Sequence, residues 1–362
     1  MPFPIKPPIE PMLAKPTPEI PTEPGWIFEP KWDGFRTLVF RDGADLYLQS
    51  RDLRPFDRYF PELLDPLRAL AGSSARFVLD GEIVIAGERG LDFDAMLLRI
   101  HPAASRVAML AEETPASFVA FDCLADEADD LRSVSFAERR HHLQRLLAKP
   151  PASVLLTPST EDPEVAREWF NDFEGAGLDG VIAKRADQPY APGKRTMAKI
   201  KHLRTADCVV AGFRWHKNGP GTLVGSLLLG LFDAEGRLQH VGVTASFSLA
   251  KRAELVAFLE PYRKDALGGH PWREWREWEE RATVEGRRLP GATSRWNRGK
   301  DLSWEPLRPE LVAEVAYDHL QGDRFRHGTT FVRWRHDKSP TECRYDQLEE
   351  TPPALLADLF GT

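Results

Sequence analysis

The pattern of apolar and polar positions predicts that the chain begins with a sheet. Leu38-Val39-Phe40 and Leu46-Tyr47-Leu48 flank Asp42-Gly43, a dipeptide typical of tight β-hairpin turns. Residues 77–85 and 118–122 are further strand-like runs. Before them, residues 1–25 carry many prolines, which predicts an extended and largely irregular arm.

Helical patterns are mixed irregularly with these strands. A capping box, Ser135-x-x-Glu138, predicts the start of one helix, and Asp162-Pro163 predicts the start of another. Short strands are predicted to follow at residues 178–184 and 198–201. Because strands and helices do not alternate strictly, we predict an α+β domain with antiparallel sheets rather than a doubly wound fold.

The pattern changes near residue 203, where we place a boundary between domains at residues 1–203 and 204–362. Short strands separated by turns and one helix are typical of a small β-barrel, and an OB-fold is the expected kind. The predicted strands are residues 208–215, 226–232, 238–244, 311–317 and 331–335, and the helix is residues 248–259. In the polar stretch 261–304, Trp272, Trp275 and Trp278 recur every third residue, which is consistent with a short helix.

Composition narrows the class of protein. The chain has 362 residues, 42% hydrophobic and 28% charged, an ordinary globular composition. It contains no run of about 18 apolar residues and no signal-peptide pattern, so we expect no membrane span and a cytoplasmic location. Three widely spaced cysteines suit a reducing compartment. The net charge of −7 argues only weakly against nucleic-acid binding, because basic residues can cluster locally.

The stretch from Glu29 to Arg36 holds the first candidate for chemistry. It places Lys31 before Asp33-Gly34, between two apolar runs. A lysine amine can attack phosphorus or a carbonyl, so Lys31 is a candidate covalent nucleophile. Taken alone, the stretch leaves open a surface lysine at the end of a strand.

Further clusters follow Lys31 in order along the chain. Each alone has an ordinary explanation: a turn for Asp-Gly, core packing for a phenylalanine, and a solvated face for alternating lysines. The clusters are Ser50-Arg51, Asp80-Gly81-Glu82, Phe121-Asp122, Asp179 to Lys184, Lys199-Ile200-Lys201, and Arg335-His336-Asp337-Lys338. In this order they resemble the motifs of the covalent nucleotidyltransferases, which comprise DNA ligases, RNA ligases and mRNA-capping enzymes.

Two local patterns narrow the resemblance. Phe121-Asp122-Cys123-Leu124 with Glu138-Arg139-Arg140 resembles ATP-dependent DNA ligases, and the position of Lys31 near the start resembles the compact bacterial enzymes. Tyr190-x-Pro192-Gly193 and residues 322–329 are similar to the C type rather than the ligase domain of the multifunctional D type. The resemblance implies an α+β nucleotidyltransferase (adenylation) domain with antiparallel sheets, followed by an OB-fold β-barrel domain.

The resemblance also implies how ATP is held. Lys31 would take AMP covalently from ATP and release pyrophosphate. Keeping a free lysine neutral at pH 7 costs roughly 4.6 kcal/mol, so nearby cations must lower that cost. The residues implied to contact the nucleotide are Glu29, Arg36, Arg51, Glu82, Phe121, Arg195, Lys199, Lys201, Arg335 and Lys338. Within this set, Phe121 would stack on adenine, and Glu29 would accept a hydrogen bond from the adenine amino group.

Glu82 and Asp179 are the implied ligands of Mg²⁺ or Mn²⁺, which prefer hard oxygen donors. The family more often has glutamate at the position of Asp179, so the shorter side chain favours contact through water. For Glu82, contact with the ribose is an equal alternative. In the last domain, Arg335 and Lys338 would orient pyrophosphate, and Arg295, Trp296, Arg298 and Lys300 are a candidate grip on DNA.

We therefore predict a monomeric, bacterial, nucleoid-associated ligase that seals nicks in double-stranded DNA during repair. A repair primase-polymerase or an end-binding protein is an expected partner, and no membrane is. Two alternatives stay open: an RNA ligase or GTP-using capping enzyme, and a non-catalytic nucleic-acid-binding protein that keeps the fold. Glu29 and the Phe121 context argue against capping, and the intact set of Lys31, Glu82, Lys199 and Lys201 argues against a non-catalytic protein.

Overall fold

The computed structural model describes residues 4–72, 75–87, 90–202, 204–273, 303–318 and 320–348. The described residues form two compact units, residues 4–202 and 204–348, each with its own apolar core. Among the described residues, the structure contains no helix with the length and apolar content needed to cross a membrane.

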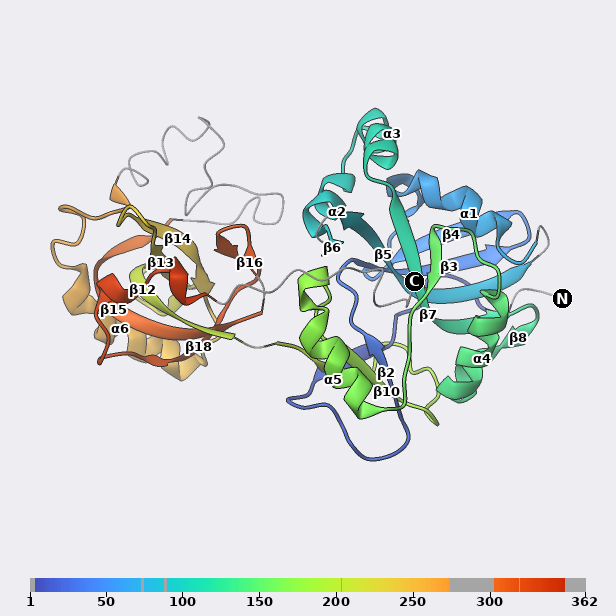
Figure 1. The fold of residues 1–362 in the computed structure, drawn as a ribbon. Helices are drawn as coiled ribbons and strands as arrows, with labels where there is room; N and C mark the ends of the chain where they lie inside the picture. The colour runs from blue at the N-terminus through green and yellow to red at the C-terminus, as the bar shows by residue number, and fades with distance from the viewer. Residues whose placement is uncertain are drawn as a thin grey trace. The chain divides into compact units, whose positions relative to one another are not determined.

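The larger sheet of the first unit has seven strands, and the neighbours in its main path are antiparallel (Figure 1). Its order is β4-β3-β5-β7-β8, while β6 pairs with β5 and β9 runs parallel to β7. The strands are β3 (Phe35–Asp42), β4 (Asp45–Ser50), β5 (Arg76–Gly87), β6 (Gly90–Leu91), β7 (Ala116–Asp126), β8 (Asp129–Asp130) and β9 (Val154–Leu156).

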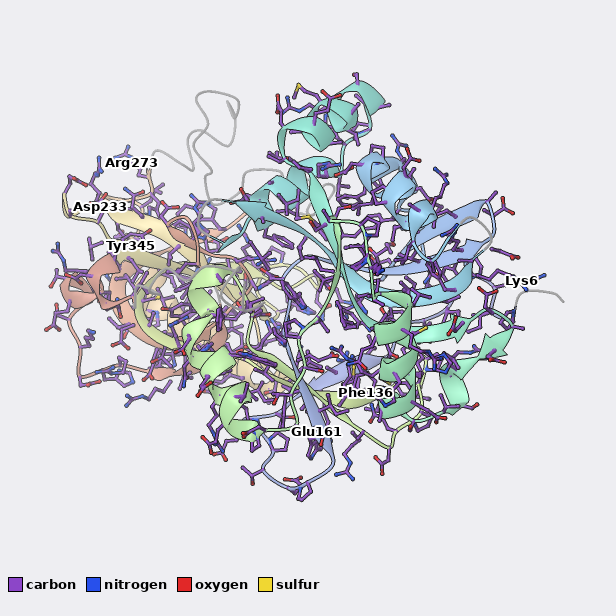
Figure 2. All side chains as sticks on the ribbon, turned by 45° about the vertical axis from the view of Figure 1, so that its right-hand side comes forward. Lys6, Phe136, Glu161, Asp233, Arg273 and Tyr345 are labelled. Atoms are coloured by element: carbon purple, nitrogen blue, oxygen red, sulfur yellow. The ribbon has the colours of Figure 1, made fainter. Side chains whose placement is uncertain are left out.

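Three of the described helices of this unit, α2, α4 and α5, begin at a residue whose side chain caps the first turn. The Ser135 and Asp162 side chains accept hydrogen bonds from the first turns of α4 and α5, and Phe136, labelled in Figure 2, is the first residue of α4. The helices are α1 (Leu64–Ala69), α2 (Phe93–Arg99), α3 (Ala104–Glu113), α4 (Phe136–Leu146) and α5 (Pro163–Asp172). Short 3-10 turns are η1 (Asp57–Tyr59), η2 (Pro61–Leu63), η3 (Leu131–Ser133) and η4 (Glu174–Ala176).

A second sheet of this unit packs against the first. It contains β1 (Leu13–Pro16), β11 (Arg195–Ile200), β10 (Val181–Arg185) and β2 (Trp26–Pro30), in that order. Met197 on β11 packs with Leu38 on β3 and Val78 on β5, so an apolar layer joins the two sheets. Because side chains alternate along a strand, the face of β3 that carries Leu38 also carries Arg36, which pairs directly across from Glu82. The face of the large sheet that is apolar at Leu38 is therefore polar at Arg36 and Glu82, next to the apolar layer.

The second unit is built on a five-stranded antiparallel sheet of order β14-β13-β12-β15-β18. Thr329, just before β18, donates its N–H to the Val243 carbonyl on β14, which brings the two sheet edges together as in a barrel. Helix α6 packs against β13 and β15. The elements are β12 (Arg204–Trp215), β13 (Val224–Phe232), β14 (Leu238–Thr244), α6 (Leu249–Arg263), β15 (Glu305–Tyr317), β16 (Leu320–Gln321), β17 (Arg324–Phe325), β18 (Thr330–Trp334), η5 (Pro340–Glu342) and η6 (Tyr345–Gln347).

The predicted α+β class is confirmed, and the structure adds elements that the sequence did not predict. Residues 13–16 of the N-terminal arm form β1, which runs parallel to β11. Helices α2 and α3 and strand β9 were not predicted. Trp275 and Trp278 lie outside the described residues, so the short helix suggested by the three tryptophans is described only at Trp272, which is fully buried in the core of the second unit.

Candidate active site

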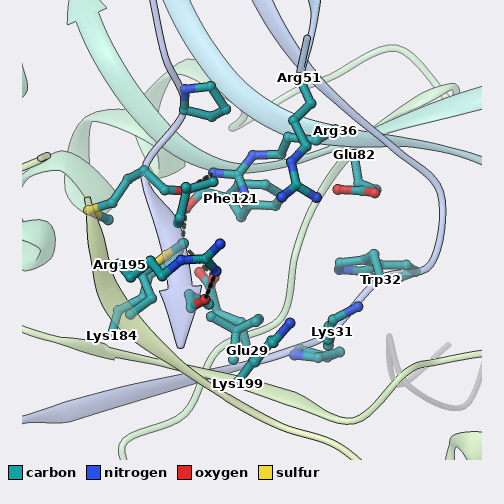
Figure 3. Close-up of a pocket in the computed structure, with 17 residues that line it drawn as sticks. Glu29, Lys31, Trp32, Arg36, Arg51, Glu82, Phe121, Lys184, Arg195 and Lys199 are labelled. Carbon is teal, nitrogen blue, oxygen red and sulfur yellow. Dashed lines mark hydrogen bonds and ion pairs between the residues drawn. The ribbon is translucent and has the colours of Figure 1, made fainter. Parts of the chain in front are cut away.

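A pocket of the first unit collects most of the predicted site residues (Figure 3). Its walls come from both sheets of the unit and from the segment preceding β1. The predicted residues that line it are Glu29, Lys31, Arg36, Arg51, Glu82, Phe121, Arg195 and Lys199. These residues span 171 positions of sequence, from 29 to 199, and the fold brings them to one cavity.

Lys31 lies directly after β2, where the backbone of a second motif holds it. The Lys31 N–H donates to the Gly180 carbonyl, and the Asp179 N–H donates to the Lys31 carbonyl, each over 2.8 Å. Gly180 has φ +101°, and a Cβ there would lie 2.0 Å from the Ile200 carbonyl oxygen. A side chain at residue 180 would therefore separate the segments that carry Lys31, Asp179 and Lys201.

Three lysines and one aspartate form the charged floor of the site. Lys31 Nζ lies 2.5 Å from Asp179 Oδ2, and Lys201 Nζ lies 2.6 Å from the same oxygen. Lys199 lies on β11 and lines the pocket. Burial lowers the pKa of Lys199, and the charges of Lys201 and Lys31 lower it further. Lys201 does not line the pocket but reaches Lys31 through Asp179, so all four predicted residues belong to one cluster.

Arg36 and Glu82 form the opposite wall. The Arg36 guanidinium donates to both carboxylate oxygens of Asp80, at 2.5 and 2.7 Å. Burial disfavours this cation, but the Asp80 carboxylate outweighs burial and raises the pKa of Arg36. Tyr190 donates to the same carboxylate over 2.7 Å. Asp80 and Tyr190 therefore fix the direction of Arg36, a contact that sequence spacing alone did not predict.

Glu82 is the candidate metal ligand in the pocket. Burial raises the pKa of Glu82 to about 7, against the opposing charges of Arg36 and Lys31. A divalent cation fits this carboxylate, because it would stabilise the charged form that burial disfavours. Nowhere in the described ranges do three or more His, Cys, Asp or Glu side chains form a ready-made metal site. Mg²⁺ keeps several waters and binds through one or two carboxylates together with substrate phosphates, so a single carboxylate such as Glu82 can serve as its ligand.

Phe121 and Glu29 form another part of the pocket lining. The Phe121 side chain is buried, with the Arg36 guanidinium 4.5 Å and the Lys184 ammonium 4.7 Å from its ring centroid. Asp122, the next residue, forms a fully buried ion pair with Arg139 of α4, which anchors this part of β7. Glu29 lies on β2 and pairs with Lys184 and Arg140.

Lys184 and Arg140 are site residues that sequence reasoning did not assign. Both fell inside motifs named above, Asp179 to Lys184 and Glu138 to Arg140, but only Lys184 follows an apolar run, whereas Arg140 stands among charged and polar residues. Long-range pairing with Glu29, 155 and 111 residues away, is the signal that reveals them. No local pattern predicts such pairs.

Arg335 and Lys338 belong to the second unit, where they share a different aspartate. Arg335 Nη1 and Lys338 Nζ lie 2.8 and 2.9 Å from Asp207 Oδ2. Asp337 also accepts from Arg335, and these carboxylates raise the pKa of Arg335 despite partial burial. The predicted DNA-gripping residues Arg295, Trp296, Arg298 and Lys300 lie outside the described residues.

Comparisons with known proteins agree with this arrangement. Residues 11–201 match the model of the ATP dependent DNA ligase domain, and residues 220–338 match that of the ATP dependent DNA ligase C terminal region. The chain is 52% identical to DNA ligase C2 of Mycolicibacterium smegmatis, covering 97% of each chain, and 51% identical to DNA ligase C of Mycobacterium tuberculosis, covering 99% of each. These matches confirm the resemblance to the C type.

A solved structure supports the same fold. A Lig E DNA ligase superposes with a TM-score of 0.54 at 17% identity, covering 90% of this chain and 99% of that one. The predicted nucleotidyltransferase and OB-fold architecture is thereby confirmed. From the two family models and from relatives that match along nearly the whole chain, we conclude that this chain belongs to the ATP-dependent DNA ligases.

Proposed function

We propose that the chain seals nicks in double-stranded DNA through an AMP carried on Lys31. The observation that supports this most directly is the position of the Lys31 amine. It lies at a pocket lined by Lys199, Glu82 and Phe121, within 2.5 Å of Asp179. A nucleophilic amine, phosphate-binding cations, a hard oxygen ligand and an aromatic platform are what transfer of a nucleotide to the enzyme requires.

In the first step, the Lys31 nitrogen attacks the α-phosphorus of ATP. A P–N bond forms, the bond to the bridging oxygen of pyrophosphate breaks, and pyrophosphate leaves. The amine must lose its proton before it attacks, and Asp179 Oδ2 already accepts a hydrogen bond from Lys31 Nζ. Lys199 and Lys201 would neutralise the charge that develops on the phosphate oxygens. A divalent cation at Glu82 would supply further charge neutralisation at those oxygens.

The remaining pocket residues would hold the nucleoside. Phe121 would stack on adenine, and Glu29 would accept from the adenine amino group. Arg36, which donates to Asp80, and Arg51, directly after β4, both line the pocket and would contact the ribose and a phosphate. Arg195 lines the same pocket at the start of β11 and is proposed to contact the nucleotide as well.

In the later steps, AMP passes from Lys31 to a 5′-phosphate at the nick. The adjacent 3′-hydroxyl then attacks that phosphate, and AMP leaves as the strand is closed. Arg335 and Lys338 of the second unit are proposed to orient pyrophosphate in the first step. A likeness to the multifunctional non-homologous end joining DNA repair protein LigD of Mycobacterium tuberculosis, 31% identical over 88% of this chain, supports a role in bacterial DNA repair.

The test is label transfer from nucleotide to protein. We would incubate the full chain with α-labelled ATP or GTP and Mg²⁺, separate it by denaturing electrophoresis, and map the adduct by peptide mass spectrometry. We expect AMP on Lys31, release of label on adding pyrophosphate, and little transfer from GTP. Absence of any covalent nucleotide, or an adduct on another residue, would contradict the proposal.

A further inference from the structure

The carboxylate of Glu29 is held by two cations from different elements. Its side chain is only 3% exposed. Arg140 Nη1 on α4 lies 3.0 Å from Oε1, and Lys184 Nζ on β10 lies 2.7 Å from Oε2. Lys184 lines the nucleotide pocket, whereas Arg140 does not. Each oxygen of Glu29 is thus fixed by its own partner, and one of those partners lies outside the nucleotide space.

Arg140 connects Glu29 to Thr157, a residue that is hydrogen-bonded to the strand carrying Phe121. Its Nη2 donates to the Thr157 carbonyl oxygen. The Thr157 hydroxyl accepts from Trp32 Nε1 over 2.8 Å, and the Thr157 N–H donates to the carbonyl of Ala120, the neighbour of Phe121. A guanidinium with two engaged nitrogens has a fixed orientation, so it holds the carboxylate at a defined angle.

Lys184 is a hydrogen-bond donor that this arrangement keeps turned away from a bound base. Its ammonium is engaged by Glu29 Oε2 and by the Phe121 carbonyl, 3.1 Å away, and it lies 4.4 Å from the Phe136 ring centroid. A carboxylate only accepts hydrogen bonds, so a fixed Glu29 matches an amino group at position 6 of a purine and repels a carbonyl there. The Lys184 ammonium only donates hydrogen bonds, so at the position of the Glu29 carboxylate it would match a carbonyl at position 6 and repel an amino group.

We propose that Arg140 is a positioning residue that sets the purine selectivity of this pocket, by fixing Glu29 as the acceptor and thereby keeping Lys184 occupied. The proposal rests on the proposed function of the pocket. Without Arg140, only Lys184 would hold Glu29, and the carboxylate could rotate on that single contact. The fixed acceptor for the 6-amino group is then lost, and the Lys184 ammonium can donate to a 6-carbonyl.

A purely structural role for Arg140 makes a different prediction. Arg140 is buried, and removing one partner of a buried ion pair destabilises a fold. General damage to the fold would lower transfer from every nucleotide by the same factor. Selection through Glu29 would instead change the ratio between nucleotides according to the group at position 6, which is an amino group in ATP and a carbonyl in GTP. GTP also differs from ATP at positions 1 and 2, so purine riboside triphosphate, which differs from ATP at position 6 alone, isolates that contribution.

The experiment measures the second-order rate constant for single-turnover label transfer to the full-length protein, at subsaturating concentrations of three triphosphates. These are ATP, GTP and purine riboside triphosphate, which lacks the 6-amino group. The variants are Arg140→Met, which keeps bulk without charge, and Arg140→Lys, which keeps charge without the second arm. Arg145→Met is the matched control, because Arg145 lies on the same helix with a side chain that is 66% exposed.

In Arg140→Met we expect the ratio of ATP to GTP to fall about tenfold or more, the scale for a charged hydrogen-bond partner. The advantage of ATP over purine riboside triphosphate should fall in parallel. The ratios of Arg140→Lys should be intermediate, and those of Arg145→Met should match wild type.

Unchanged ratios in both Arg140 variants would overturn the proposal. If Arg140→Met does not fold, the ratios measured for Arg140→Lys decide. A wild-type protein that takes no label from ATP would overturn the proposed function itself, and this inference with it.

Discussion

Each unit of the molecule contains two basic side chains that share one oxygen of one aspartate. In the first unit, Lys31 and Lys201 lie 2.5 and 2.6 Å from Asp179 Oδ2. In the second, Arg335 and Lys338 lie 2.8 and 2.9 Å from Asp207 Oδ2. The contact geometry is alike, but the surroundings differ, and the difference bears on the proposed roles of the two clusters.

The two clusters differ in charge balance. Near Asp179, Lys199 adds a third cation, and burial together with Lys201 and Lys31 lowers its pKa. Near Asp207, Asp337 adds a second carboxylate, and Arg335 lowers the pKa of Asp337 to about 2. The first cluster therefore has an excess of positive charge suited to a phosphate, whereas the second is close to neutral until an anion displaces a carboxylate.

The largest effect should come from Lys31→Ala. Without the amine no P–N bond can form, so label transfer from ATP should fall to background. Sealing of a nick already carrying 5′-AMP should survive much better, since that step needs no new lysine adduct. Lys149→Ala, at an exposed position, is the control. Residual labelling of Lys31→Ala would mean that the Asp179 cluster does not contain the nucleophile.

The second-largest loss of adenylation rate is expected for Lys201→Ala. This change removes one of the cations paired with Asp179 and a cation proposed to neutralise the phosphate, so adenylation should slow by about 10². Single-turnover adenylation rates at saturating ATP measure it, with melting temperature as a check on folding. A loss of less than a few-fold would show that Lys201 only balances Asp179.

In the second unit, Asp207→Asn should have a moderate effect. The amide keeps the shape but not the charge that holds Arg335 and Lys338, so we expect adenylation to slow about tenfold. Arg335→Ala should slow adenylation at least as much. Both variants should seal a pre-adenylated nick at near the wild-type rate, because that step involves no pyrophosphate. Equal losses in both steps would instead assign the Asp207 cluster to holding the fold.

The smallest effect should come from Arg333→Ala. Arg333 lies two residues before Arg335 on β18, but it pairs with Glu314 at the surface with a side chain that is 61% exposed. Surface pairs of this kind contribute up to about 1 kcal/mol to stability. Adenylation and sealing rates should both match wild type. A loss like that of Arg335→Ala would show that general positive charge, rather than the shared aspartate, matters in this unit.

Local sequence determined the elements whose signals are short-range. Asp42-Gly43 predicted the β3–β4 hairpin, and Gly43 indeed has a positive φ of 63°. Ser135 and Asp162 predicted the starts of α4 and α5, where their side chains cap the first turns. Such features depend on hydrogen bonds between residues a few positions apart, so one stretch of sequence contains the whole interaction.

Other elements depended on contacts that no local pattern reveals. Strand β1, in the proline-rich arm, exists because β11, some 180 residues later, pairs with it. Strand β9 likewise forms beside β7. Short strands of this kind have little intrinsic preference of their own, and backbone pairing with a distant neighbour stabilises them.

The site divides in the same way. The ordered motifs indicated which side chains to consider, because lysines, carboxylates and an aromatic at those positions suit nucleotide transfer. Only the tertiary structure decided their partners: Asp179 between Lys31 and Lys201, and Arg140 with Lys184 on Glu29. Ion pairing depends on distance and burial in three dimensions, and residues more than a hundred positions apart acquire both only when β2 pairs with β10 and α4 packs beside them.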